Sequence, residues 1–124
     1  MVQTDIPQLS AETADWRQTL RNYRNEFTED KKLLQNSCKT LTKQQFQDVE
    51  HFHNQFHIQL INIHDLKQKI KAHERQVQSE FSSNNHLQEQ TYGEHERLLE
   101  EFIILDNTLQ GLRDEFKKFI SSTT

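Results

Sequence analysis

Residues that break helices are nearly absent from this chain. Its 124 residues contain two glycines and one proline, and the proline lies at position 7. β-Hairpins, β-barrels and the glycine-rich loops that bind phosphate all need positive-φ positions, which glycine fills most readily. Helix is the structure that remains, and the length fits one domain. We therefore expect a single all-α domain over residues 1–124.

The first predicted helix covers residues 11–37, with Ser10 as its N-cap. Apolar residues recur along this segment at spacings of three and four, which places them on one helix face. The clearest part of this stripe is Trp16, Leu20, Tyr23 and Phe27. The stripe predicts a helix with one buried face.

The second predicted helix covers residues 43–81 and has the sharpest start signal in the chain. Thr42 and Gln45 have the spacing of a capping box. Leu41 and Phe46 have the spacing of a hydrophobic staple, so the helix should begin at residue 43. It should end before the turn-forming sequence Ser-Ser-Asn-Asn at residues 82–85.

The third predicted helix ends near residue 120 and has two candidate starts. A cap at Asn85 with Gln88 gives a start at 88, and a cap at Thr91 with Glu94 gives a start at 91. Gly111 lies inside this helix and costs about 1 kcal/mol relative to alanine, which predicts a close approach of another helix there. The apolar heptad positions are Leu98, Phe102, Leu105, Leu109, Leu112, Phe116 and Phe119.

Short connections between these helices favour antiparallel neighbours. The expected fold class is therefore all-α, an antiparallel bundle of three long helices formed by a helical hairpin plus a third helix, with coiled-coil-like packing. Because the second helix is the longest, Val77 and Phe81 should extend beyond the three-helix core. Either a second copy covers them, which predicts a homodimer, or residues 87–92 fold back over them.

Histidines on the second predicted helix form the one grouping that suggests chemistry. His53 and His57 have the i, i+4 spacing with which two imidazoles bind one Zn²⁺, or another divalent transition metal, from a single helix. His64 lies on the same side but nearly two turns further along. The candidates for a third ligand are Glu50, Glu26 and Glu115. The alternative is that these histidines are core-boundary residues with half-buried rings and no metal.

The other four histidines fall on other helix faces, and we expect them at the surface or in loops. They are His51, His73, His86 and His95.

Charge is spread along the chain, with 15 basic and 19 acidic residues and a net charge of −4. No global field attracts nucleic acid or an anionic membrane, so neither is expected as a partner. Neighbouring acids should neutralise the basic stretches, as Asp65 would neutralise Lys69 at i, i+4. These stretches are Arg17, Arg21 and Arg24 in the first helix and Lys67, Lys69, Lys71 and Arg75 in the second.

No apolar run approaches the roughly 18 residues that span a bilayer, and the N-terminus lacks the features of a secretory signal. With Cys38 as the single cysteine, a cytoplasmic location is expected. No nucleophile elbow, phosphate loop or diagnostic catalytic pair is present, so we do not expect an enzyme. We expect a non-enzymatic scaffold or protein-interaction module without a cofactor, which binds a protein partner or itself. The alternative is a metal-binding bundle that uses His53 and His57.

Overall fold

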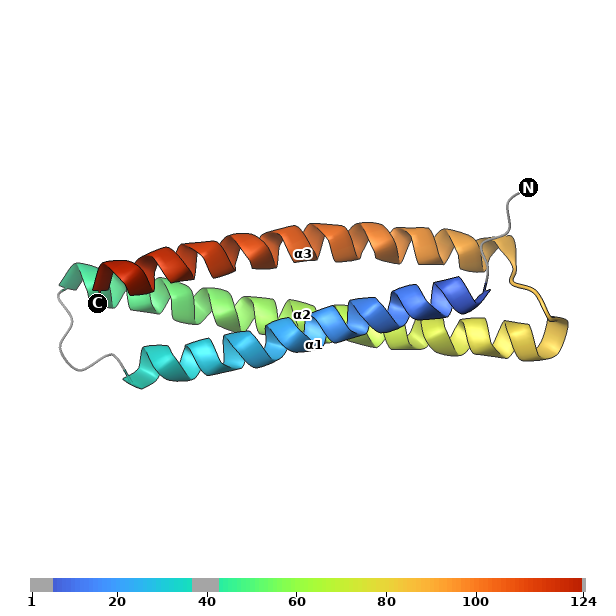
Figure 1. Ribbon diagram of the computed structural model, residues 1–124, viewed down its shortest axis with the longest axis horizontal. Helices are drawn as coiled ribbons and strands as arrows, with labels where there is room; N and C mark the ends of the chain where they lie inside the picture. Colours follow the sequence, from blue (N-terminus) through green and yellow to red (C-terminus); the bar gives the residue numbers. More distant parts are fainter. Residues whose placement is uncertain (1–5, 37–42, 124) are drawn as a thin grey trace.

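The chain forms three long antiparallel helices in a computed structural model that describes residues 6–36 and 43–123 (Figure 1). Helix α1 is Ile6–Asn36, α2 is Lys43–Asn84 and α3 is Glu89–Thr123. The start of α1 lies near the α2–α3 connection, and the end of α3 lies beside the start of α2 (Figure 1). The expected all-α bundle is confirmed. Among the described helices, none has both the length and the apolar character of a membrane span.

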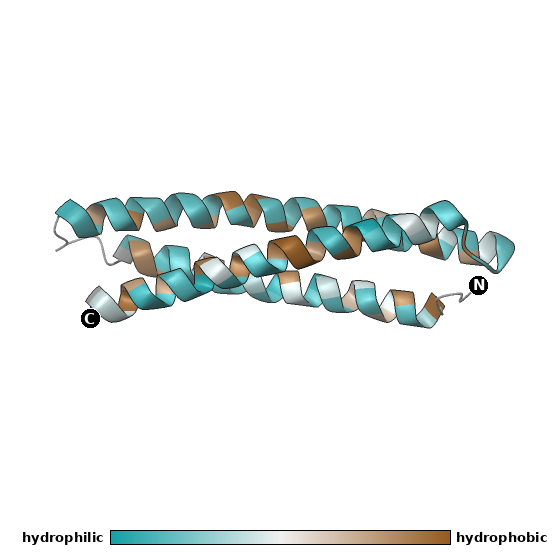
Figure 2. Cartoon of the chain, turned by 90° about the horizontal axis from the view of Figure 1, so that it is seen from above, coloured by the Kyte–Doolittle hydropathy of each residue, from teal (hydrophilic) through white to brown (hydrophobic). Residues whose placement is uncertain are grey.

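Helix α2 packs against both other helices and supplies the largest share of the core. Its buried apolar side chains are spaced by three, four or seven residues, so they lie on one helix face, which the sequence pattern predicted. They are Val49, Phe52, Phe56, Ile63, Leu66 and Ile70. Figure 2 shows hydrophobic and hydrophilic segments alternating along the helices, as expected when each helix buries one face.

Aromatic rings fill the core at the end of the bundle where α2 begins and α3 ends. The ring of Phe56 lies 5.0 Å from that of Phe116 in an edge-to-face arrangement. It also lies 5.1 Å from the ring of Phe27, which brings α1 into the same cluster. Edge-to-face pairs add about 0.5–1.5 kcal/mol beyond the area they bury. This cluster therefore holds all three helices together at one end.

Helix α1 begins at Ile6, five residues before the expected start at residue 11, so Ser10 lies inside the helix and is not its N-cap. The proline at position 7 is compatible with this start, because the first turn does not need its missing N–H. The extra turn also carries an apolar side chain into contact with the end of α2. Leu9 packs with Val77 and Leu87 in a second, smaller core cluster.

This second cluster bears on the two explanations offered for the long α2, but only for Val77. Leu87 belongs to the cluster, and Tyr92 packs against it, so the segment after α2 folds back over Val77. Phe81 stays 43% exposed. The end of α2 therefore does not require a second copy of the chain to cover Val77.

Helix α2 ends three residues later than predicted, at Asn84. Asn85 then has a φ of 63°, and its N–H donates to the carbonyl of Phe81 at 2.9 Å. Asparagine is the residue that most often replaces glycine in this left-handed helix-ending conformation. At the other end, α2 begins at Lys43 as predicted. The capping residues Leu41 and Thr42 lie outside the described residues.

Helix α3 begins at Glu89, between the two predicted starts. The carbonyl of Gln88 accepts the N–H groups of Thr91 and Tyr92, at 3.0 and 3.2 Å. Neither Asn85 nor Thr91 is therefore the N-cap. The helix continues to Thr123, three residues beyond the predicted end.

Long side chains join α1 to α3. The guanidinium of Arg113 donates two hydrogen bonds to the carboxylate of Glu26, at 2.8 and 2.7 Å. It also lies 4.6 Å from the centre of the Tyr23 ring, whose hydroxyl donates to Asp106 at 2.8 Å. Burial and the neighbouring Asp106 raise the pKa of Tyr23 to about 12, so this hydroxyl keeps its proton.

Gly111 does not lie at a close helix approach, contrary to the sequence expectation. A Cβ atom added at this position meets no heavy atom within 4 Å. The residue is exposed, so nothing in the packing around it requires the absence of a side chain.

We predict that Gly111→Ala stabilises the protein by about 1 kcal/mol, because alanine loses less backbone entropy than glycine in a helix and meets no neighbour here. Urea denaturation followed by circular dichroism measures the change. Ala72→Gly, at an exposed position in α2, is the matched control and should lower stability by a similar amount. A Gly111→Ala variant that is less stable than wild type would contradict the finding that no neighbouring atom lies near position 111.

Candidate functional site

The predicted metal ligands His53 and His57 lie one turn apart on α2 but in different surroundings. His53 is half-buried and lines a hollow of about 320 Å³ between α1 and α2, together with Glu50 and Leu34. His57 is exposed and does not line that hollow. Of the candidate third ligands, Glu50 is therefore the one that shares a surface with His53.

The other two candidate ligands lie elsewhere. Glu26 is held by both hydrogen bonds from Arg113, so its carboxylate already has a cation as its partner. Glu115 is exposed on α3. Within the described residues, no group of three or more histidine, cysteine or acidic side chains is placed to hold a metal ion. The pairing of His53 with His57 stays a prediction, and the structure adds no third ligand to it.

A different pair of histidines is buried between the helices. His73 on α2 is 4% exposed, and His95 on α3 is 5% exposed. The Nε2 atom of His73 lies 3.0 Å from Nδ1 of His95. Nε2 of His95 lies 2.8 Å from a carboxylate oxygen of Glu12 on α1. The expectation that His73 and His95 lie at the surface or in loops was wrong.

A sequence signal for this pair exists. His73 lies three residues after Ile70 and four before Val77, and all three are buried at the spacing of the apolar stripe. His95 lies four residues after Thr91 and three before Leu98, which are also buried. Extending each apolar stripe through its polar members would have placed both histidines at the helix interface.

The hydrogen bonds constrain the protonation pattern of this group. An ionised Glu12 only accepts, so Nε2 of His95 donates to it. The other ring nitrogen of His95, Nδ1, shares a proton with Nε2 of His73, and the tautomers of the two rings decide which of them donates. The second nitrogen of His73, Nδ1, is buried with no hydrogen-bond partner among the described residues. Burial and the nearby His95 lower the pKa of His73, which favours its neutral form.

Stacking fixes the position of His95. The ring of Trp16 lies 4.9 Å from the His95 ring. The same Trp16 ring also stacks on the ring of Phe102, at 5.8 Å. Trp16 belongs to the predicted apolar stripe of α1 and is buried. The apolar core and the histidine pair are therefore continuous, with Trp16 between them.

Glu80 forms a second buried polar group at the same end of the bundle. Its carboxylate accepts the backbone N–H of Gln88 at 2.8 Å, the amide of Gln76 at 2.6 Å and the hydroxyl of Thr91. Burial raises the pKa of Glu80, but these three hydrogen bonds outweigh it and hold the pKa below its usual range. Because Gln88 directly precedes α3, Glu80 places a negative charge at the start of that helix, where the helix dipole favours it.

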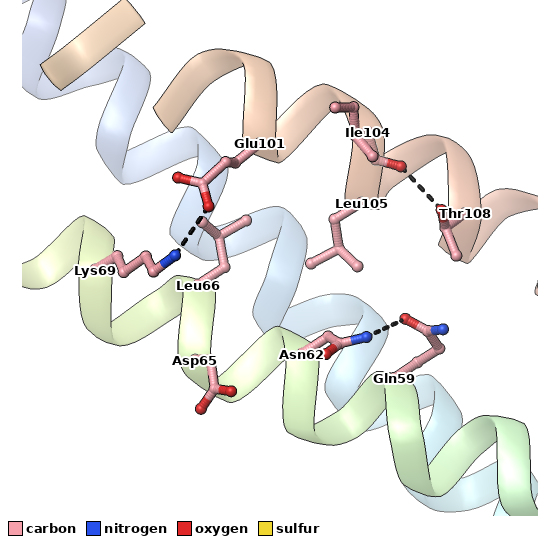
Figure 3. A pocket seen from close by; sticks show the side chains of 9 residues that line it. All are labelled: Gln59, Asn62, Asp65, Leu66, Lys69, Glu101, Ile104, Leu105 and Thr108. Carbon is pink, nitrogen blue, oxygen red and sulfur yellow. Dashed lines mark hydrogen bonds and ion pairs between the residues drawn. The ribbon is translucent and has the colours of Figure 1, made fainter. Parts of the chain in front are cut away.

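An open groove runs between α2 and α3 in the middle of the bundle (Figure 3). Its volume is about 540 Å³, and Leu66 and Leu105 project into the space between the two helices. Lys69 and Glu101 form an ion pair of 2.9 Å across it, so Lys69 pairs with α3 and not with Asp65 as the spacing suggested. We call this the α2–α3 groove. Its lining residues are Gln59, Asn62, Asp65, Leu66, Lys69, Glu101, Ile104, Leu105 and Thr108.

Of the exposed isoleucines in this part of the bundle, Ile104 is the one that lines the α2–α3 groove. Ile104 is 68% exposed, and Ile58, Ile61 and Ile103 are each close to half exposed. The contacts of Phe56 with Phe116 and of Lys69 with Glu101 enclose the stretch of bundle in which all four isoleucines lie. Exposed large apolar side chains that gather in one region mark a binding surface more often than isolated ones do.

Comparison of the chain with protein-family models, with curated proteins and with solved structures finds no match.

The metal prediction for His53 and His57 is tested by the metal content of untagged protein purified without added metal or chelator. If the two imidazoles bind one divalent ion, wild-type protein carries a stoichiometric metal and His53→Ala/His57→Ala carries none. The same replacement at exposed His51 and His64 is the control and should leave metal content unchanged. Equal metal content in all three proteins would end this hypothesis.

The buried His73 predicts a pH-dependent stability. Its pKa is lowered by burial, so the unfolded chain binds this proton more readily than the folded chain. Stability is complete above the unfolded value of about 6.5 and falls as the pH drops below it, by at most about 1.4 kcal/mol per pH unit. The free energy of unfolding of His73→Gln, relative to that of wild type, should therefore rise as the pH is lowered from 8 to 5.5. Urea denaturation at each pH measures this difference.

Asp30 provides a control of opposite sign. Burial, followed by the charge of Glu26, raises its pKa to about 6. Its folded form therefore binds a proton more readily, and the cost of its charge is removed as the pH falls through 6. Asp30→Asn should lose stability relative to wild type over the same pH interval. If the difference between His73→Gln and wild type does not change with pH, the buried neutral His73 is refuted.

Proposed function

We propose that this chain is a protein-interaction module, a helical-bundle scaffold that associates with a second copy of itself through the α2–α3 groove. The observation that supports the proposal is the exposure of Ile104, which lines the groove and is 68% exposed. Fully burying an isoleucine side chain contributes about 1.5–3 kcal/mol. Association with a second copy would bury part of this exposed side chain and gain part of that free energy.

The geometry of the groove favours a second copy as its occupant. The groove lies between two antiparallel helices, so a two-fold axis through its centre places each helix of one copy against a helix of the other. Closed two-fold dimers of this kind are the commonest oligomers. The result is a four-helix contact of the type found in helical bundles. The interface then uses the same residues on both copies.

The available area is sufficient for such a dimer. A helix of the length of α2, with 42 residues, extends over about 63 Å, and its exposed face is about 10 Å wide. Contact along this whole face, which extends well beyond the groove residues 59–69, would bury about 600 Å² on each copy, or about 1,200 Å² in total. That is the lower end of the range for stable protein interfaces. We therefore expect a dimer that dissociates on dilution.

Light scattering over a range of protein concentrations tests this proposal. Wild-type protein should approach twice the chain mass of 14.9 kDa, and Ile104→Lys should stay monomeric because it places a charge in the interface. Asn107→Lys is the control, since it adds a lysine on an exposed position of α3 that does not line the groove. A wild-type protein that is monomeric at every concentration would exclude self-association as its function.

A further inference from the structure

A row of cationic side chains lies along the contact between α1 and α2. Arg17, Arg21 and Arg24 follow an i, i+4, i+7 spacing, which places them on one face of α1. The ion pair of Arg17 with Glu74 and the ring contact of Phe27 with Phe56 place this part of α1 beside the part of α2 that carries Lys67 and Lys71. We call the five cationic residues the cationic seam.

Lys67 lies at the centre of the cationic seam and is only 8% exposed. Its pKa lies below its usual range, with burial as the largest cause. The charges with the largest further effect are all cations, namely Arg24, Lys71, Arg21 and Arg17. A buried lysine is normally paired with an acid. Here the surrounding charges repel it.

Only one end of the cationic seam is neutralised. The Nε atom of Arg17 lies 2.7 Å from Glu74, which also accepts the hydroxyl of Thr13 at 3.1 Å. Within residues 6–36 and 43–123, no ion pair joins the other four members of the seam to a carboxylate.

Two hollows lie on the same side of the α1–α2 pair, one at each end of the cationic seam. The first, of about 280 Å³, is lined by Leu9, Ala14, Arg17 and Val77 among others. The second, of about 320 Å³, is the one lined by Leu34 and His53. At 100° per residue, Ser10 and Gln35, which line the two hollows, lie within about 40° of the seam arginines around α1.

We propose that the cationic seam binds an acidic amphipathic helix of a partner protein, with carboxylates against the seam and apolar side chains in the two hollows. A carboxylate row at i, i+4 and i+7 on such a helix has the same rise as the arginine row, because both follow 1.5 Å per residue. Arginine also pairs with carboxylates through two parallel hydrogen bonds. The occupant would lie along the cationic seam, between the two hollows, as a fourth helix away from the α2–α3 groove.

An acidic helix fits the seam better than a nucleic acid does. The net charge of the whole chain is −4, which repels a long polyanion. Proteins that bind single strands stack bases on accessible aromatic rings. The aromatic side chains of α1 beside the seam, Trp16, Tyr23 and Phe27, are all buried in the core.

Fluorescence anisotropy with a labelled helical peptide tests the proposal. The peptide carries glutamates at i, i+4 and i+7 and leucines towards both ends, and a second peptide has lysines in place of the glutamates. We expect the glutamate peptide alone to bind, with a Kd that rises with salt. Arg21→Glu/Arg24→Glu should weaken binding about tenfold or more, since both residues are exposed and their reversal leaves the core intact. Lys118→Glu, an exposed residue on α3, is the control for added negative charge.

Lys67→Met separates this proposal from a purely structural role of the lysine. Methionine keeps the buried stem and removes the charge, so the variant should unfold at a higher temperature and bind the glutamate peptide about fivefold more weakly. Loss of thermal stability in Lys67→Met would overturn the proposal, because the lysine would then stabilise the free protein. Equal binding of the glutamate peptide to all variants, or preferential binding of a single-stranded oligonucleotide, would also overturn it.

Discussion

Packing on both sides of α2 is the constraint on which the rest of the structure depends. Its apolar stripe faces α1 and α3 together, so each of those helices buries its own stripe mainly by contact with α2. Helices α1 and α3 meet each other chiefly through large side chains such as Trp16, Tyr23 and Arg113. The two hollows beside the cationic seam lie between α1 and α2, and the α2–α3 groove lies on the other side of α2. Both proposed binding surfaces therefore result from having only three helices around an elongated core.

The existence and order of the helices could be predicted because they depend on local features. Spacings of three and four apolar residues, the scarcity of glycine and the turn sequence at residues 82–85 are all visible in the chain. The helix ends were less predictable. Leu9 adds a turn to α1 because it packs on Val77, and Glu80 acts at the start of α3 although it belongs to α2. These contacts join residues far apart in the sequence.

The candidate sites show a similar division. The i, i+4 spacing of His53 and His57 is visible in the sequence and predicts a metal site there. In the structure, His53 is half-buried and His57 is exposed. His73 and His95 are 22 positions apart in the sequence, so no short spacing pattern links them. Only the three-dimensional contact of α2 with α3 brings them together. The basic stripe on α1 is visible in the sequence. Lys67 lies among its arginines only because of the way α1 is aligned lengthwise against α2.

The buried polar groups at one end of the bundle also bear on how the helices align lengthwise. Long apolar stripes with heptad-like spacing tolerate a shift of seven residues, because most apolar contacts are re-formed after the shift. Such a shift of α3 along α2 would separate His73 from His95 and Glu80 from Gln88 and Thr91. Each buried polar group left without a partner costs about 1–3 kcal/mol. The apolar stripes thus supply most of the attraction, whereas a few polar contacts select one alignment among several that the stripes alone would permit.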